Sequence, residues 1–221
     1  MFVNKERYLQ LFSDLQEKNV CLVAVSKTKP AAAIEELYAL GHRDFGENYV
    51  QELLTKADVL PKDIRWHFIG HLQSNKVKQI IPFVYLIHGV DSEKLLVEIQ
   101  KQAQKTGRQV DVLLQMFIAS EETKFGFNAL ELKDLAFLIK ENKFPNVRVR
   151  GLMGMASFTE DVGQVRQEFL LLRKAFEELK AILPGSDFTI LSMGMSNDYE
   201  LALDAGTNMV RIGSLIFGSR N

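Results

Sequence analysis

A lysine follows the first apolar run of the chain. Residues 20–25 (VCLVAV) have the near-continuous apolar sequence of a parallel strand that is buried on both faces. Side chains alternate along a strand, so Lys27 falls on the same face as Val23 and Val25. The carboxyl ends of such strands carry the active sites of α/β proteins. Lys27 is therefore a candidate nucleophilic amine, although seen alone it is more simply a solvated loop lysine.

Two loops near the end of the chain combine a glycine with a hydroxyl group. Ser192 and Gly194 lie in the segment SMGMSND, and Gly213 and Ser214 lie in RIGS. Glycine lets a backbone approach an anion, and the amino terminus of a following helix favours negative charge. Barrels often bind phosphate at their last two loops. Either glycine alone is best explained as a tight turn, but the two together predict a phosphate site.

Arg211 lies in the otherwise apolar stretch MVRIG. An arginine in a strand must find a partner, because burying it unpaired is costly. It either pairs with an acidic residue of the protein or donates to a ligand. A lysine, an arginine and a phosphate site together suggest a phosphorylated aldehyde held as a Schiff base. Pyridoxal 5'-phosphate meets all three requirements, and a Schiff-base aldolase acting on a sugar phosphate fits nearly as well.

Eight strand signals, each followed by a helix signal, predict a single-domain (β/α)8 TIM-like barrel over residues 1–221, with an extra helix at 4–18. A doubly wound open sheet is the competing fold. The strands are expected at 20–25, 43–45, 65–69, 83–88, 110–116, 147–153, 188–191 and 209–212. Ser74, and Ser196 or Asn197, are expected to cap helices.

In a barrel the residues that follow the strands meet at one mouth. They make up one candidate site: Lys27, Asn48, His71, Gln73, His88, Met153, Met155, Ser192, Gly194, Arg211, Gly213 and Ser214.

No metal site is expected. His67 and His71 are four residues apart, which is ~13 Å in an extended chain and too far for one metal ion. The chain has one cysteine and no clustered carboxylates. A Ser-His-Asp triad has no nucleophile-elbow motif to support it.

Composition limits the class of protein and its partners. At 47% hydrophobic and 25% charged residues, the chain is typical of a globular protein, and a net charge of −1 gives no reason to expect a nucleic-acid or membrane partner. The lone Cys21 argues against a disulfide scaffold and for a reducing compartment. Neither a signal peptide nor a run of ~20 apolar residues is visible, so we expect a cytoplasmic protein.

Six segments carry a resemblance to a known family. They are AVSKTKP at 24–30, FGENYVQE at 45–52, WHFIGHLQSNK at 66–76, RGLMGM at 150–155, SMGMSND at 192–198 and VRIGSLIFG at 210–218. Through them the chain resembles the YggS/PROSC family of pyridoxal-phosphate-binding proteins, which is related to the barrel domain of bacterial alanine racemase. WHFIGHLQSNK is a specific signature, and the segments extend over nearly the whole chain.

The resemblance implies a TIM-like barrel in which Lys27 forms the Schiff base and Arg211 faces the pyridine nitrogen. It further implies that the phosphate is held by Ser192, Gly213 and Ser214, with Asn48 near the cofactor. The family is described as maintaining pyridoxal phosphate homeostasis without established turnover. We therefore expect a monomeric, non-catalytic cofactor carrier, with pyridoxal-phosphate-dependent apoenzymes as possible recipients.

The alternative is a slow amino-acid racemase. Racemisation needs acid/base groups on both faces of the cofactor, and alanine racemase takes its tyrosine from a second domain that is not expected in this chain. A mouth residue such as Lys124 or His71 would have to replace it. Protonated Arg211 would also leave the ring nitrogen unprotonated and weaken the cofactor as an electron sink. The carrier is thus the simpler expectation.

Overall fold

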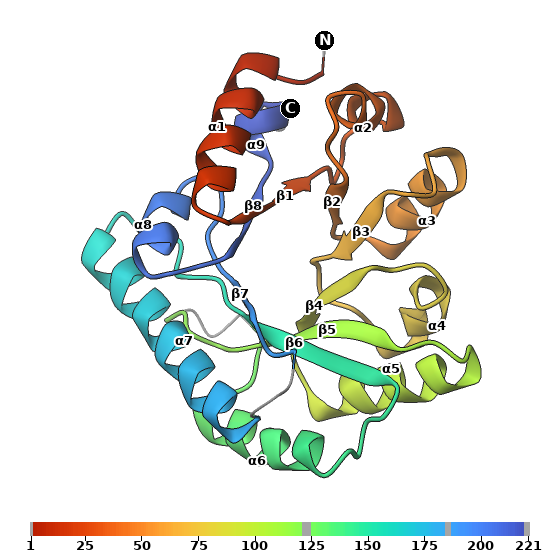
Figure 1. Ribbon diagram of the computed structural model, residues 1–221, viewed down its shortest axis with the longest axis vertical. Helices are drawn as coiled ribbons and strands as arrows, with labels where there is room; N and C mark the ends of the chain where they lie inside the picture. Colours follow the sequence, from red (N-terminus) through yellow and green to blue (C-terminus); the bar gives the residue numbers. More distant parts are fainter. Residues whose placement is uncertain (1, 121–124, 184–186, 219–221) are drawn as a thin grey trace.

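The computed structural model describes residues 2–120, 125–183 and 187–218, and within them eight parallel strands close into a barrel in sequential order (Figure 1). The strands are β1 (Cys21–Val25), β2 (Asp44–Glu47), β3 (Arg65–Phe68), β4 (Leu86–Val90), β5 (Val110–Gln115), β6 (Val147–Met153), β7 (Ile190–Ser192) and β8 (Met209–Ile212). Pairing of Cys21 with Met209 and of Val23 with Arg211 joins β1 to β8. The expected (β/α)8 barrel is confirmed.

Helices surround the barrel on the outside (Figure 1). They are α1 (Lys5–Glu17), α2 (Ala31–Tyr38), α3 (Val50–Val59), α4 (Val77–Ile80), α5 (Glu93–Lys105), α6 (Ala129–Lys140), α7 (Val162–Ile182), α8 (Tyr199–Asp204) and α9 (Ser214–Phe217), with a 3₁₀ turn, η1 (Ser74–Lys76). The expected extra helix is α1, which lies beside α9, where Asn4 N donates to Ile216 O at 2.8 Å. Among the described residues no helix is long and apolar enough to cross a membrane.

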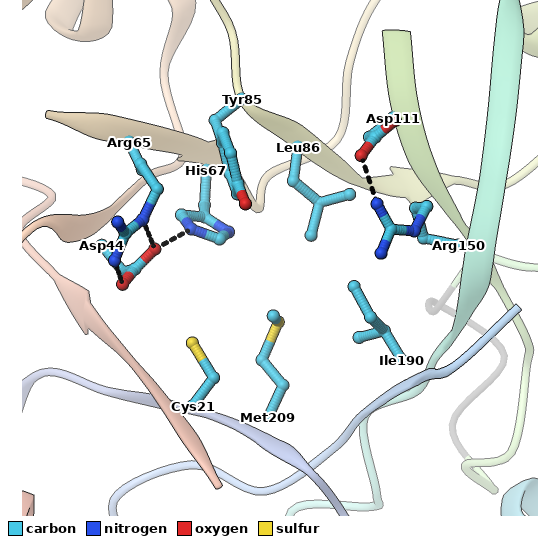
Figure 2. Close-up of a pocket in the computed structure, with 10 residues that line it drawn as sticks. All are labelled: Cys21, Asp44, Arg65, His67, Tyr85, Leu86, Asp111, Arg150, Ile190 and Met209. Atoms are coloured by element: carbon cyan, nitrogen blue, oxygen red, sulfur yellow. Dashed lines mark hydrogen bonds and ion pairs between the residues drawn. The ribbon is translucent and has the colours of Figure 1, made fainter. Parts of the chain in front are cut away.

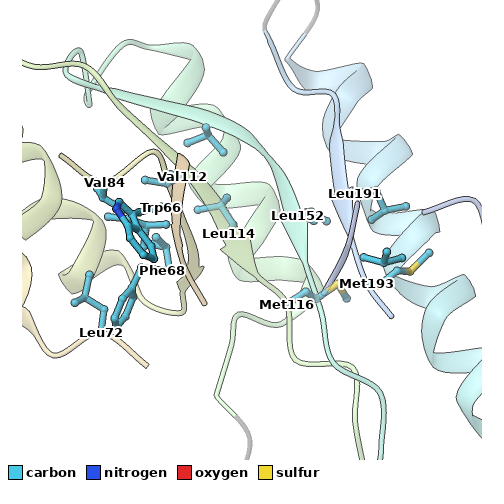
Figure 3. Close-up of a cluster of buried hydrophobic side chains, with 14 of the residues drawn as sticks. Trp66, Phe68, Leu72, Val84, Val112, Leu114, Met116, Leu152, Leu191 and Met193 are labelled. Carbon is cyan, nitrogen blue, oxygen red and sulfur yellow. The ribbon is translucent and has the colours of Figure 1, made fainter. Parts of the chain in front are cut away.

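Alternation along the strands divides the apolar side chains into two layers. One set points into the barrel and consists of Val23, Leu86, Leu113, Met153 and Met209. The opposite set, which includes Val112, Leu114, Leu152 and Leu191, points outward into the larger core that the helices cover (Figure 3). A strand covered on both faces has no polar side, which explains the near-continuous apolar runs in the sequence.

Several strand boundaries differ from expectation by one to three residues, and the starts of β4 and β7 have a clear physical cause. Strand β4 begins at Leu86 rather than Phe83, because Phe83 and Val84 are hydrogen-bonded back to Ile80 at the end of α4. Strand β7 begins at Ile190 rather than Phe188, whose ring stacks on Phe176 at 5.2 Å. An apolar run does not distinguish a strand residue from a loop residue that packs on a helix.

The two expected helix caps are also wrong. Ser74 begins the 3₁₀ turn and is not a cap for α4, which Lys76 precedes. Helix α8 is preceded by Asp198 rather than Ser196 or Asn197, and its first turn has no side-chain cap. Ser196 instead accepts a hydrogen bond from Gly213 N, so a tertiary contact takes the hydroxyl that sequence assigned to a cap.

Buried His42 predicts a pH-dependent stability. Its ring packs edge-on against Tyr8, Phe12 and Phe45, and Nε2 is 2.9 Å from Asp44 O. Burial lowers the pKa of His42 to about 4, opposed in part by the hydrogen bond to Asp44. Because the folded state favours the neutral ring, its stabilisation is complete above the unfolded pKa and is lost as the pH falls toward about 4.

The expected loss of unfolding free energy from this group between about pH 7 and about pH 4 is about 3 kcal/mol. Urea denaturation at the two pH values measures it. His42→Gln keeps a neutral donor and acceptor, so this variant should lose less stability on acidification. An equal loss in both proteins would show that other groups cause it.

Candidate functional site

A cavity of about 400 Å³ opens at the carboxyl ends of the strands. It is walled by the loops that follow β1, β2, β3, β6, β7 and β8. Its lining includes Val25, Lys27, Lys29, Asn48, Ile69, Met155, Ser157, Phe158, Met195, Ser196, Asp198, Arg211, Gly213 and Ser214. Of the residues predicted to form the mouth, Lys27, Asn48, Met155, Arg211, Gly213 and Ser214 lie together here.

A buried ion network supports the loop that carries Lys27. The Lys56 ammonium on α3 donates to Ser26 O at 2.8 Å and to Glu47 Oε1 and Glu52 Oε1, both at 2.7 Å. Ser26 Oγ donates to the same oxygen of Glu47 at 2.6 Å. Lys56 thus anchors the residue before Lys27, and its role was not predicted from sequence.

The residue after Lys27 is held by the same network. Thr28 N donates to Glu52 Oε1 at 2.6 Å, and Thr28 has a φ of 65°, in the left-handed region that residues with a branched Cβ rarely adopt. Both neighbours of Lys27 are therefore tied to α3. The second cavity lysine, Lys29, donates from Nζ to Phe217 O at 2.9 Å, at the end of α9.

Glu47 lies at the centre of this network and is fully buried. Its Oε2 has no hydrogen-bond partner among the described residues. Burial raises the pKa of Glu47, and the ammonium of Lys56 opposes that shift. The carboxylate consequently depends on Lys56 for most of its compensation.

Asn48 brings an unsatisfied acceptor to the cavity wall. Its Oδ1 is buried and has no hydrogen-bond partner among the described residues. The backbone of Asn48 is closely packed, since a Cβ at Gly70 would lie 2.2 Å from Asn48 O. A ligand donor would remove the cost of this orphan oxygen.

Arg211 on β8 is almost entirely buried, and its hydrogen bonds explain how it is tolerated. Nη1 donates to Ser192 Oγ at 2.7 Å and Nη2 donates to Gly154 O at 3.1 Å. Burial lowers the pKa of Arg211 to about 10, and the nearby negative charge of Asp198 opposes the shift. The guanidinium therefore stays protonated at neutral pH and reaches the cavity wall.

The two glycine loops contribute differently from the prediction. Gly213 and Ser214 line the cavity, whereas Ser192 and Gly194 are buried and are not among its lining residues. Gly194 has a φ of 94°, and a Cβ there would lie 2.6 Å from Ala202 Cβ, so packing against α8 requires the glycine. Ser196, four residues after Ser192, supplies the loop's hydroxyl to the wall. The repeated serine in SMGMSND was the available signal.

Two of the expected mouth histidines lie elsewhere. His88 was expected to follow strand four, but it lies within β4, fully buried inside the barrel. His71 is exposed, is paired through Nδ1 with Asp91 Oδ2 at 2.8 Å and does not line the cavity. Lys124, the other expected second base, lies outside the described residues. Within the described part of the chain, no group of histidine, cysteine and carboxylate side chains is placed to hold a metal ion.

Comparison with known proteins decides the family. Residues 5–221 match the family model described as alanine racemase, N-terminal domain. The chain belongs to this family. Two of its relatives are named pyridoxal phosphate homeostasis protein. That of Aquifex aeolicus (strain VF5) is 44% identical over 204 residues, covering 90% of this chain and 86% of the relative. That of Homo sapiens is 42% identical over 211 residues, covering 90% and 76%.

Two solved structures are similar to the chain. PipY of Synechococcus elongatus PCC7942, solved with PLP bound, superposes with a TM-score of 0.86 at 38% identity, covering 96% of this chain and 99% of PipY. Alanine racemase from Bartonella henselae has a TM-score of 0.73 at 18% identity, covering 96% and 59%, and shows the fold alone. The resemblance inferred from the six sequence segments is confirmed.

Proposed function

We propose that this protein binds pyridoxal 5'-phosphate and serves intracellular homeostasis of that cofactor as a carrier or reservoir. The observation that carries the proposal is the single cavity that brings together Lys27, Arg211 and the loop at Gly213 and Ser214. The relatives named for this function and the PipY structure with PLP bound support it.

The residues that line the cavity fit the cofactor. Lys27 would supply the amine, and Arg211 a protonated donor for the ring nitrogen. The backbone and hydroxyl of Gly213 and Ser214 would hold the phosphate, with help from Ser196. The orphan Oδ1 of Asn48 offers an acceptor for a cofactor hydroxyl. Ser192 and Gly194 would act indirectly, since Ser192 Oγ and Gly194 O both accept hydrogen bonds from Arg211.

The donor set favours holding the cofactor over using it. Pyridoxal phosphate supplies an aldehyde that condenses with a lysine amine with loss of water, and a pyridine ring that withdraws electrons best when its nitrogen is protonated. Arg211 keeps its proton at neutral pH, so it donates a hydrogen bond without giving up that proton. The cavity thus favours retention of the cofactor, with a pyridine ring that withdraws electrons only weakly.

Several narrower statements belong to the same proposal. We infer a non-catalytic protein whose 221 residues act as one monomeric domain in the cytoplasm and deliver the cofactor to dependent apoenzymes. The one cysteine, Cys21, suits a reducing compartment. Of the two second bases expected for the racemase alternative, His71 does not line the cavity and Lys124 lies outside the described residues. The named relatives and the PipY structure with PLP bound favour pyridoxal phosphate over a sugar phosphate as the ligand.

Borohydride reduction of the loaded protein, followed by peptide mapping, tests the site. The pyridoxyl mass is expected on Lys27 and should persist in Lys29→Ala, because Lys29 is held at Phe217 O. A label on Lys29 or Lys76 would show that the assignment of the reactive amine to Lys27 is wrong. The same loaded protein, incubated with L-amino acids, should form D-amino acids no faster than free cofactor does. A clearly faster rate would refute the non-catalytic role.

A further inference from the structure

A second, smaller pocket of about 170 Å³ lies at the amino-terminal end of the barrel (Figure 2). Two ion pairs border it. Asp44 accepts from Arg65 Nε at 2.7 Å, and Asp111 accepts from Arg150 Nη1 at 2.8 Å. The ring of His67 points from β3 toward Asp44, with Nε2 at 3.0 Å from Asp44 Oδ1.

From Asp44 a line of hydrogen-bonded side chains runs through the barrel. His67 Nδ1 is 2.9 Å from His88 Nε2, and His88 Nδ1 is 3.4 Å from Ser192 Oγ. Ser192 Oγ accepts from Arg211 at 2.7 Å. The line joins β2, β3, β4, β7 and β8, and connects the amino-terminal pocket to the arginine of the large cavity. His67, His88 and Ser192 are each fully buried.

The chemistry of Asp44 sets the direction of the first bond in the line. A carboxylate only accepts, so His67 Nε2 must carry a proton. In the arrangement proposed below, His67 Nδ1 accepts from His88 Nε2, so that His88 accepts at Nδ1. Ser192 must therefore donate its own proton to His88. Its oxygen lone pairs are left for Arg211, which can only donate.

We propose that His67 and His88 are positioning residues for the cofactor cavity: through Ser192 they form a one-way hydrogen-bonded line that holds the guanidinium of Arg211 toward the ligand. Nη1 and Nη2 each have a protein acceptor in Ser192 Oγ and Gly154 O, so the plane of the guanidinium is fixed from behind. The line ends at Asp44: burial raises the pKa of its carboxyl group, but the hydrogen bonds from Arg65 and His67 outweigh burial and hold the pKa well below its usual range. Each donor thus polarises the next toward Asp44.

The contact from His88 to Ser192, at 3.4 Å, is the longest in the line. The effect of a substitution on cofactor binding should therefore decrease with distance from Arg211 along the line. Ser192→Ala removes the partner of Arg211 directly and should be most severe. His88 comes next and His67 last. Apolar side chains would fill the same space at less cost, as they do at Leu113 and Met153 in the same interior. Retaining three polar groups here is consistent with a positioning role.

The first test determines the tautomers of His67 and His88 in the protein without cofactor. Long-range proton–nitrogen NMR on the unloaded protein should show both His67 and His88 neutral, with their protons on Nε2. In Ser192→Ala the His88 resonances should shift, because Nδ1 loses its donor. A proton on His88 Nδ1, or a doubly protonated His67, would overturn the proposed direction.

The second test rests on the proposed function and uses pyridoxal 5'-phosphate as the probe. His88→Met is compared with His42→Met, which removes an equally buried histidine that lies off the line. His88→Met should weaken binding about tenfold more than His42→Met, equivalent to about 1.4 kcal/mol. It should also change the absorbance spectrum of the bound cofactor, and His88→Gln, which keeps a donor and an acceptor, should restore both.

The outcomes separate the two proposals. If the unaltered protein does not bind pyridoxal phosphate, the proposed function fails, whereas the tautomer pattern still stands or falls on the NMR result. If the unaltered protein binds and His88→Met matches His42→Met in affinity and spectrum, the positioning role is refuted. A His88→Gln variant as impaired as His88→Met would refute it equally.

Discussion

Lys27→Ala is expected to abolish covalent attachment of pyridoxal 5'-phosphate. The variant keeps Arg211 and the loop at Gly213 and Ser214, so the phosphate and ring contacts should still hold the cofactor loosely. We expect the apparent dissociation constant to rise on the order of a hundredfold, about 2.7 kcal/mol. Absorbance titration and borohydride-stable labelling measure the loss, and the labelled fraction should fall to zero.

Lys29→Ala is the matched control for this experiment. Both lysines line the cavity and both are partly exposed, but the Lys29 ammonium donates to Phe217 O. Its removal should leave colour and stoichiometry close to those of the unaltered protein. If Lys27→Ala keeps full cofactor stoichiometry and Lys29→Ala loses it, Lys29 and not Lys27 supplies the amine.

Lys56→Met is expected to be the most destabilising single change at the site. The Lys56 ammonium has three hydrogen-bond acceptors in a buried position, and Glu47 beside it is fully buried. Removing the cation leaves a buried carboxylate without its counter-charge, which costs about 3–5 kcal/mol of unfolding free energy. Urea denaturation at neutral pH measures this loss.

Two further variants make the interpretation specific. Lys101→Met removes an exposed lysine and should change stability by less than about 0.5 kcal/mol. Adding Glu47→Leu to Lys56→Met removes the stranded carboxylate and should recover part of the loss, because two matched apolar groups replace a buried ion pair at little cost. A loss below about 1 kcal/mol in Lys56→Met would contradict the dependence of Glu47 on this cation.

The same variant links stability to the cofactor cavity. Ser26 and Thr28, the neighbours of Lys27, are both tied to this network. Loosening it frees the loop that aims the Lys27 amine. The network is therefore the physical connection between the FGENYVQE segment, which supplies Glu47 and Glu52, and the lysine of AVSKTKP.

Local pattern was enough to predict the architecture of this chain. Apolar runs bounded by polar loops marked eight strands, and the helical periods between them indicated a closed parallel barrel. Alternation correctly placed Val23 inside the barrel, with Val25 and Lys27 at the cavity. These predictions succeeded because the helical period and the alternation along a strand are properties of a single element and need no knowledge of its neighbours.

Only the tertiary structure decided how deep a side chain lies within the barrel and which side chains it contacts across the barrel. A two-residue error at the end of β4 placed His88 at the mouth, although it lies in the interior next to His67. The alternation of side chains along β7 did not predict that the Ser192 hydroxyl would contact Arg211 while Ser196 lined the cavity. Lys56 resembled any lysine of an amphipathic helix until α3 packed over Glu47. Such roles arise from strand stagger and helix packing, which bring distant residues together and which no local period encodes.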